Sequence, residues 1–101
     1  MTVNGVEFDE QKVREFSRRN GVKRLALFGS ILSGDFRADS DIDVLVEFLP
    51  GTRVSLMSIG RIESELEELL GRRVDLRTPQ DLSQYFREEV VASARPLYAF
   101  V

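Results

Sequence analysis

The 101-residue chain contains neither cysteine nor histidine, and these two absences exclude more chemistry than any other feature of its composition. Without cysteine there is no disulfide, thiolate nucleophile, zinc ribbon or iron–sulfur site. Without histidine there is no Ser-His-Asp triad and no imidazole that could act as acid, base or metal ligand. Any catalysis must therefore use carboxylates, hydroxyls, Lys, Arg, backbone amides and a hard cation, which points towards chemistry at oxygen.

The chain also lacks a strong charge of either sign and a long apolar run. Its net charge of -3 argues against non-specific nucleic-acid binding, which needs a basic surface, although a cation could bridge an acidic site to a nucleotide. No run is long enough to span a membrane, and residues 1–10 lack the basic start and apolar core of a signal peptide. We expect no membrane partner and no direct nucleic-acid partner, and the lack of cysteine favours a cytoplasmic location.

The order of apolar and polar residues predicts one domain over residues 1–101 in which helices alternate with strands. Strands are expected at 24–28, 41–48 and 73–77, and helices at 9–20, 56–70 and 81–94. Asn4-Gly5 is a turn signal, but its flanking runs are too short to predict a hairpin. The apolar tail at 97–101 fits either the edge of the core or an interface. The fold class is α/β (α+β), with a small sheet flanked by helices.

Periodicity within these segments predicts which side chains face the core. The strand at 41–48 places Ile42, Val44, Val46 and Phe48 on one face and the following residues on the other: Asp41, Asp43, Leu45 and Glu47. The helix at 56–70 has an apolar stripe that starts at Leu56 and includes Ile62 and Leu66. The last helix is expected to turn these side chains inward: Leu82, Tyr85, Phe86 and Val90.

Three features could carry chemistry, and each has an ordinary structural alternative. Asp41 and Asp43 project from one face of a strand with Cα atoms about 6.5 Å apart, so they could converge on one or two Mg²⁺ ions or simply form a solvated face. Asp75 could join them, or pair with a neighbouring arginine at position 73 or 77. Gly29-Ser30 could cradle a phosphate with free N–H groups and a hydroxyl, or form a plain strand-to-helix turn.

The combination of the three features is far more specific than any one of them. A phosphate-binding turn beside a carboxylate site that holds two metal ions is typical of enzymes that catalyse phosphoryl or nucleotidyl transfer. In such a site Asp41 and Asp43 would hold both ions. Asp75 would hold the ion nearer the attacking oxygen and could help to remove its proton.

These motifs resemble the signature of a known superfamily. Leu27-Phe28-Gly29-Ser30, the spacer with Gly34, and Ser40-Asp41-Ile42-Asp43-Val44-Leu45-Val46 are similar to the signature of the DNA polymerase beta-like nucleotidyltransferases. The small size, Arg73-Val74-Asp75-Leu76 and the ending Arg95-Pro96-Leu97-Tyr98-Ala99 narrow the resemblance to the minimal nucleotidyltransferases, which usually have a HEPN-domain partner. The resemblance covers residues 22–99.

The resemblance implies a mixed sheet flanked by helices, two Mg²⁺ ions, ATP as the donor and a hetero-oligomer with a HEPN ribonuclease toxin. It implies that the chain is an antitoxin, which transfers AMP to a tyrosine hydroxyl of that toxin and so neutralises it. By the same resemblance Asp41, Asp43 and Asp75 are the metal ligands and catalytic residues. Gly29, Ser30 and Ser40 would bind the nucleotide.

One departure from the family pattern leaves alternatives open. Members commonly have a loop like Gly-Ser-Arg-Ala-Arg-Gly, whereas residues 29–34 read Gly-Ser-Ile-Leu-Ser-Gly, so both basic positions are apolar or neutral. Arg37 could compensate. One alternative is a non-catalytic antitoxin that acts by binding its toxin. Another is a nucleotidyltransferase acting on RNA or a small hydroxylated molecule, although larger relatives use an added acceptor domain for which this chain has no residues left.

Overall fold

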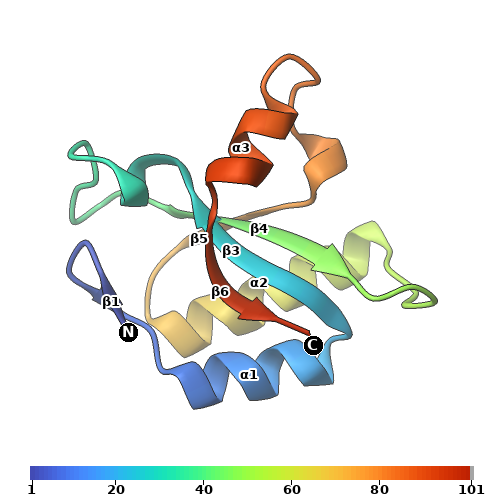
Figure 1. The fold of residues 1–101 in the computed structure, drawn as a ribbon. Coiled ribbons are helices and arrows are strands. Elements are labelled where there is room, and N and C mark those ends of the chain that lie inside the picture. The colour runs from blue at the N-terminus through green and yellow to red at the C-terminus, as the bar shows by residue number, and fades with distance from the viewer. Residues whose placement is uncertain (101) are drawn as a thin grey trace.

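A four-stranded mixed sheet forms the centre of the computed structural model, which describes residues 1–100 (Figure 1). Its strands lie side by side in the order β5 (Val74–Arg77), β4 (Ile42–Phe48), β3 (Val22–Phe28) and β6 (Arg95–Ala99). β4 runs parallel to β5 and antiparallel to β3, and β6 runs antiparallel to β3. The mixed sheet expected for this fold class is therefore confirmed.

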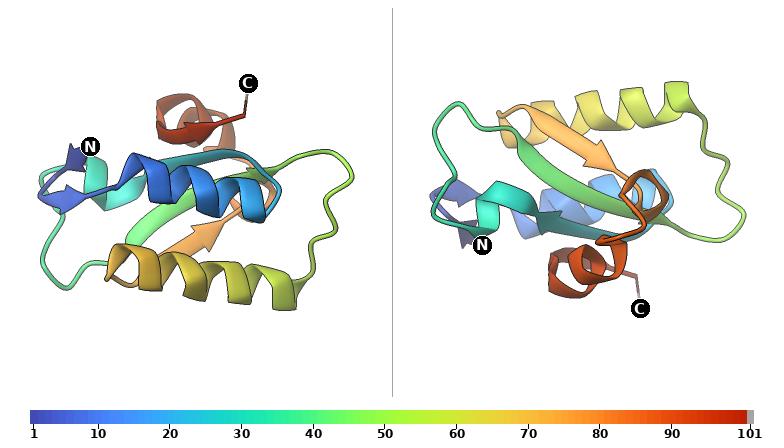
Figure 2. Two further views of the ribbon diagram at one scale, coloured as in Figure 1. Left: turned by 90° about the horizontal axis from the view of Figure 1, so that it is seen from below. Right: turned by 90° about the horizontal axis from the view of Figure 1, so that it is seen from above.

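Helices cover both faces of the sheet, as Figure 2 shows. α1 (Glu10–Arg19) and α2 (Leu56–Leu70) lie side by side on one face, and the short α3 (Arg87–Ser93) lies on the other. Side-chain caps define the starts of the two longer helices, because Asp9 accepts from the Lys12 N–H and Ser55 accepts from the Ser58 N–H, both at 3.1 Å. No helix within residues 1–100 has the length and apolar character needed to cross a bilayer.

The alternation predicted for β4 separates two apolar clusters. Ile42, Val44 and Val46 are buried in the larger cluster, beneath α1 and α2. Leu45 faces the other way and packs in a smaller cluster beneath α3, with Ala26, Leu82 and Ala94. Because Asp43 has the same parity as Leu45, it lies on the α3 face of the sheet.

The start of the chain differs from the prediction, because residues 2–7 do form a hairpin. β1 (Thr2–Val3) pairs with β2 (Val6–Glu7) through a turn in which Asn4 and Gly5 both have positive φ, 49° and 82°. Two-residue strands are too short to be stable alone. Here the hairpin is held by burial of Val3 and Val6 in the larger core, a contact with no local signal.

The last helix is shorter than predicted, and its expected inward side chains include two that face solvent. The 3₁₀ turn η2 (Pro79–Asp81) ends where the helix was expected to begin, and Asp81 caps this turn by accepting from both the N–H and the hydroxyl of Thr78. α3 begins only at Arg87, and the side chains before it, Tyr85 and Phe86, are 89% and 48% exposed. Leu82 is buried as predicted.

Two further expectations about apolar side chains need correction or refinement. Leu56 is 93% exposed, because α2 begins one turn before its first contact with the core at Ile59. The described part of the tail docks on its own sheet through residues 97–99, since residues 95–99 form β6 and Leu97 and Tyr98 pack against the larger core. Phe100 remains 57% exposed, and position 101 lies outside the described residues.

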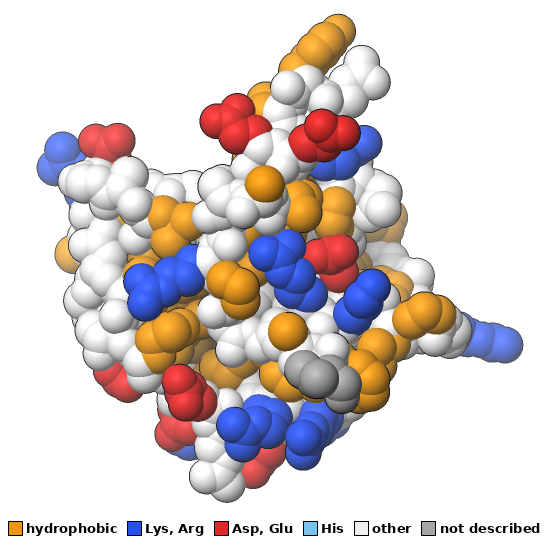
Figure 3. All heavy atoms as spheres, in the orientation of Figure 1, with side chains coloured by type: hydrophobic (Ala, Val, Ile, Leu, Met, Phe, Trp, Pro, Cys, Tyr) orange, Lys and Arg blue, Asp and Glu red, His pale blue; other side chains and the backbone are white. Residues whose placement is uncertain are grey.

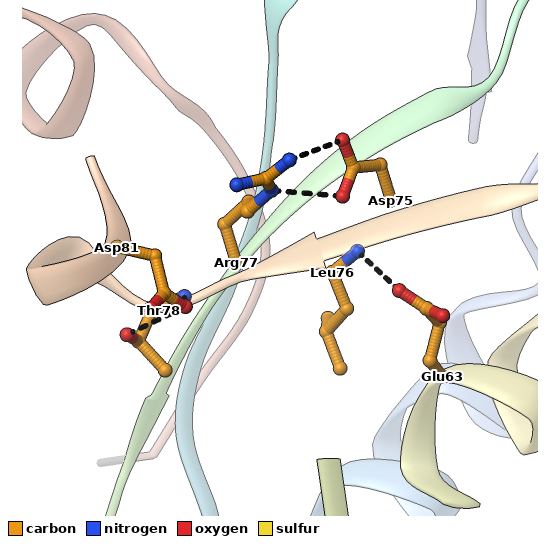
Figure 4. A network of polar contacts seen from close by, with 6 residues as sticks. All are labelled: Glu63, Asp75, Leu76, Arg77, Thr78 and Asp81. Carbon is orange, nitrogen blue, oxygen red and sulfur yellow. Dashed lines mark hydrogen bonds and ion pairs between the residues drawn. The ribbon is translucent and has the colours of Figure 1, made fainter. Parts of the chain in front are cut away.

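The outer edge of β5 is bonded to side chains of α2. The Leu76 N–H donates to the Glu63 carboxylate at 2.9 Å (Figure 4). The Val74 N–H donates to the Glu67 carboxylate, also at 2.9 Å. Glu63 and Glu67 are one helical turn apart, so they match alternate residues of the strand. These bonds satisfy edge amides that would otherwise be open to another chain, and they fix the position of Asp75 between them.

Candidate active site

The sheet brings the predicted site residues to one end of the α3 face. Gly29 and Ser30 follow β3 directly and begin the 3₁₀ turn η1 (Gly29–Leu32), which confirms the predicted helical turn near Ser30. In the sheet register Asp43 lies opposite Phe28 on one side and beside Asp75 on the other. The end of β3 therefore lies beside the start of β4, and the start of β4 lies beside β5, which brings Gly29, Asp43 and Asp75 into one region.

Gly29 is required at this junction for two separate reasons. Its φ is +75°, a conformation that costs any residue with a side chain. A Cβ atom at this position would also lie 2.2 Å from Oδ2 of Asp43, well inside contact distance. The missing side chain is what allows the Asp43 carboxylate to stand against the backbone of η1.

The Asp43 carboxylate lies in an unfavourable electrostatic environment. Partial burial, followed by repulsion from the Asp75 and Asp41 carboxylates, raises its pKa above the ordinary value for aspartate. The Arg77 guanidinium and the backbone N–H of Ser30 act in the opposite direction, but they do not cancel the rise. Three carboxylates thus share one small region with incomplete compensation, which is the setting in which a divalent cation is stabilising.

Asp75 and Asp41 each have an arginine nearby, but only the pair at Asp75 is within hydrogen-bond distance. Nε of Arg77 lies 2.9 Å from Oδ1 of Asp75 and its Nη2 lies 3.2 Å from Oδ2, so the guanidinium engages both carboxylate oxygens (Figure 4). Nε of Arg73 lies 4.0 Å from Oδ1 of Asp41, with the arginine side chain 87% exposed. The pairing of Asp75 with an arginine, one of the alternatives raised by the sequence, is therefore present.

The donor set suits a hard cation such as Mg²⁺, because it consists of carboxylate oxygens alone. Within residues 1–100, however, no three acidic side chains already stand close enough together to hold a metal ion. Both oxygens of Asp75 are engaged by Arg77. The three aspartates have the ligand chemistry that a divalent metal prefers, and Asp43 and Asp75 lie side by side in the sheet. For all three to ligate a metal, Asp75 must give up or share its contact with Arg77.

The segment before Asp41 is a closed turn held by its own polar groups. The Ser40 hydroxyl accepts from the Arg37 N–H at 3.0 Å, and Arg72 donates to the Ser40 carbonyl at 3.0 Å. The Arg72 guanidinium also lies 4.9 Å from the centre of the Phe36 ring. Ser40 thus shapes the approach to Asp41, and its expected contact with a nucleotide is untested.

Sequence reasoning missed one residue that supports the site from outside it. The Asn4 side chain donates to the carbonyls of Ile31 at 3.2 Å and Ser33 at 2.9 Å, which ties the N-terminal hairpin to η1. No sequence signal connects positions so far apart. For Arg77 a signal existed, because alternation in 73–77 places it on the same face as Asp75.

A groove elsewhere on the molecule is separate from these carboxylates. It lies between α1 and β6, has a volume of about 340 Å³ and is lined by Arg14, Arg18, Leu97 and Phe100 among others. Figure 3 shows the face of the molecule that carries β6 and α1, where Lys and Arg side chains lie among hydrophobic ones. None of the three site aspartates lines this groove.

Comparison with known proteins agrees with this geometry. The Nucleotidyltransferase domain family matches residues 10–98. A Methanocaldococcus jannaschii protein named "Putative protein adenylyltransferase MJ0435" is 34% identical over 94 residues, which cover 93% of this chain and 96% of that protein. The protein adenylyltransferase MntA of Thermococcus cleftensis is 43% identical over 65 residues, which cover 62% of each.

Among solved structures, a tri-AMPylated Shewanella oneidensis HEPN toxin in complex with MNT antitoxin contains a chain with the same fold. That chain superposes with a TM-score of 0.63 at 22% identity, covering 90% of this chain and 70% of that one. The family match spans both the glycine turn and all three aspartates of the site. The chain therefore belongs to the nucleotidyltransferase family.

Proposed function

We propose that this nucleotidyltransferase is an antitoxin that transfers AMP from ATP to a tyrosine hydroxyl of a HEPN ribonuclease toxin. The observation that carries the proposal is the close stacking of the Asp43 carboxylate on the backbone of Gly29, beside Asp75. Protein adenylyltransferases are among the relatives of the chain, and a solved AMPylated HEPN toxin is bound to a protein of this fold. The cytoplasm, where no disulfide chemistry is needed, is the proposed location.

The proposed reaction is a single displacement at phosphorus. The tyrosine oxygen forms a bond to the α-phosphorus of ATP, and the bond from that phosphorus to the bridging oxygen breaks, so pyrophosphate leaves with the electron pair. Asp75 would take the proton of the attacking hydroxyl. The Ser30 hydroxyl and the backbone N–H groups of η1 that Asp43 does not engage would hold phosphate oxygens, because no side chain caps the start of this turn.

Two Mg²⁺ ions complete the proposed site. Asp41, Asp43 and Asp75 would hold them, and when bound the ions would offset the charge of the triphosphate and of the departing pyrophosphate. The raised pKa of Asp43 supports this assignment, since it reflects burial of the carboxylate together with repulsion from Asp75 and Asp41 that the protein itself does not neutralise. Ser40 would contribute by keeping the turn before Asp41 closed.

The test is transfer of label from ATP to a co-purified HEPN toxin. Label in the α-phosphate should appear on the toxin and label in the γ-phosphate should not. Asp41→Asn combined with Asp43→Asn should abolish transfer while the variant still folds, since both substitutions are close in shape to the native residues. Asp39→Asn is the matched control, because it removes one charge from an exposed position in the same loop. Full transfer by the double variant would refute the proposal.

One observation favours a second candidate, an antitoxin that acts by binding alone. The two positions where relatives carry basic residues hold Ile31, which is buried, and Ser33, which is exposed and neutral. If the double aspartate variant still neutralised the toxin in cells without transferring AMP, binding would be the function. Loss of both transfer and neutralisation would support the enzymatic proposal.

A further inference from the structure

We infer that Arg77 is an internal counterion of this site, which occupies Asp75 in the metal-free protein and turns to the nucleotide triphosphate when divalent metal binds. Arg77 would therefore be a phosphate-binding residue that stands in for the basic residues missing from η1. The inference rests on the proposed function, because it assumes that the three aspartates take metal and that the donor is a nucleoside triphosphate.

The geometry places Arg77 in direct competition with a metal ion. Its two nitrogens contact both oxygens of Asp75, at 2.9 and 3.2 Å, so the guanidinium covers the side of the carboxylate that could ligate metal (Figure 4). In the register of the sheet Arg77 lies beside Leu45, and its side chain folds back along β5 to reach Asp75. A cation entering between Asp43 and Asp75 must displace this contact or share it.

The charges at the site indicate when the guanidinium would leave. In the metal-free protein the carboxylates of Asp75, Asp81 and Asp43 attract the guanidinium, and its charge acts on Asp43 as well as on Asp75. Two divalent cations more than neutralise three carboxylates, so after metal binding the attraction between Arg77 and Asp75 is opposed by repulsion from the metal. The triphosphate that those metals hold would then compete with the Asp81 carboxylate for the guanidinium.

The composition of the phosphate turn explains why the triphosphate needs this arginine. Residues 29–36 contain no Lys or Arg, so η1 offers backbone amides and hydroxyls but no positive charge. Arg77 is suited to supply it, because its side chain is 47% exposed and is not packed into the core. A guanidinium also presents the same two-point geometry to a phosphate as to a carboxylate, so the exchange needs only a side-chain rotation.

The decisive measurement is metal affinity without nucleotide or toxin. Mn²⁺ serves as the probe, and free Mn²⁺ is counted by electron paramagnetic resonance during titration of the full chain. Arg77→Met should bind Mn²⁺ about twofold to fivefold more tightly than the wild type, the size expected for loss of a half-exposed ion pair. Arg53→Met is the matched control, because it removes the same charge from the exposed loop that follows β4, and it should leave the affinity unchanged.

A second titration should move in the opposite direction. In saturating Mg²⁺, Arg77→Met should bind a non-hydrolysable ATP analogue about tenfold more weakly, because a charge-assisted contact to phosphate is lost. Arg77→Lys keeps the charge but not the two-point contact, so both of its affinities should lie between those of the wild type and Arg77→Met. If Arg77 were needed only for folding, its substitution would weaken the binding of both ligands, and circular dichroism would show the loss of folded structure.

The outcomes separate this inference from the proposed function. Mn²⁺ affinity of Arg77→Met equal to or weaker than that of Arg53→Met would overturn the inference, whatever the AMP-transfer assay gives. No Mn²⁺ binding by any form of the chain would overturn the metal site and this inference together. Tighter Mn²⁺ binding and weaker nucleotide binding by Arg77→Met, in a protein that transfers no AMP to the toxin, would support the inference and refute the proposed function.

Discussion

Replacing Gly29 by alanine tests the central contact of the site with one methyl group. The new Cβ would lie 2.2 Å from Oδ2 of Asp43 and 3.0 Å from its Cγ, whereas ordinary van der Waals contact begins at 3.4 Å. The carboxylate must therefore retreat by about 1.2 Å, or η1 must shift. Since the atom that is met first is the end of a flexible side chain, we expect the carboxylate to move.

The cost of this movement falls on catalysis more than on folding. The positive φ of Gly29 adds about 1–2 kcal/mol of strain for a residue with a side chain, which lowers the Tm of a domain this size by roughly 4–16 °C. Displacing a reacting group by about 1 Å costs on the order of 100-fold in rate. We expect Gly29→Ala to fold, to melt earlier and to transfer AMP about 100-fold more slowly than the wild type.

Two other glycines separate the strain from the clash. Gly51 has a φ of +87°, and a Cβ atom at that position would have no neighbour within 4 Å, so Gly51→Ala reports backbone strain alone. Gly34 has neither a positive φ nor a close neighbour, so Gly34→Ala should change little. The assay is the initial rate of AMP transfer at saturating ATP and Mg²⁺, with a thermal melt of each variant. If Gly29→Ala transferred AMP as fast as Gly51→Ala, the reasoning about the Asp43 contact would be wrong.

Three further predictions concern stability and support of the site. Asp43→Asn should stabilise the metal-free protein at pH 7 by about 0.5–1 kcal/mol, because the raised pKa of Asp43 marks a charge that the fold disfavours. The gain in free energy of unfolding, measured by urea denaturation with EDTA, should vanish as the pH falls through that pKa. Glu63→Ala should cost about 1 kcal/mol by leaving an edge amide of β5 without its acceptor, with faster hydrogen exchange there, whereas Glu63→Gln should lose less. Asn4→Ala releases η1 from the hairpin, so it should raise the KM for ATP more than it lowers kcat; an unchanged KM would contradict this role.

The elements that were predicted well are those whose signals are local. α1 and α2 have their caps and turn residues within a few positions of their ends, at Asp9, Ser55 and Gly71. β4 alternates strictly, so the faces of its residues follow from chain geometry. The hairpin at the start of the chain was missed because its stability comes from the core and not from its own length. The prediction for the last helix is wrong at Tyr85 and Phe86. The chain forms the capped turn η2 before this point and enters α3 only at Arg87, so these two side chains lie outside the helix and are exposed.

The sequence by itself determined the chemistry that is open to this protein. A chain without cysteine or histidine, with Gly29-Ser30 after one strand and two aspartates opening the next, is restricted to oxygen ligands and phosphate chemistry, because side-chain type and spacing are properties of the linear chain. Only the tertiary structure decided that Asp43 stands against Gly29, that Asp75 lies beside it and that Arg77 holds Asp75. Those contacts depend on strand order and register, which arise from the packing of residues far apart along the chain.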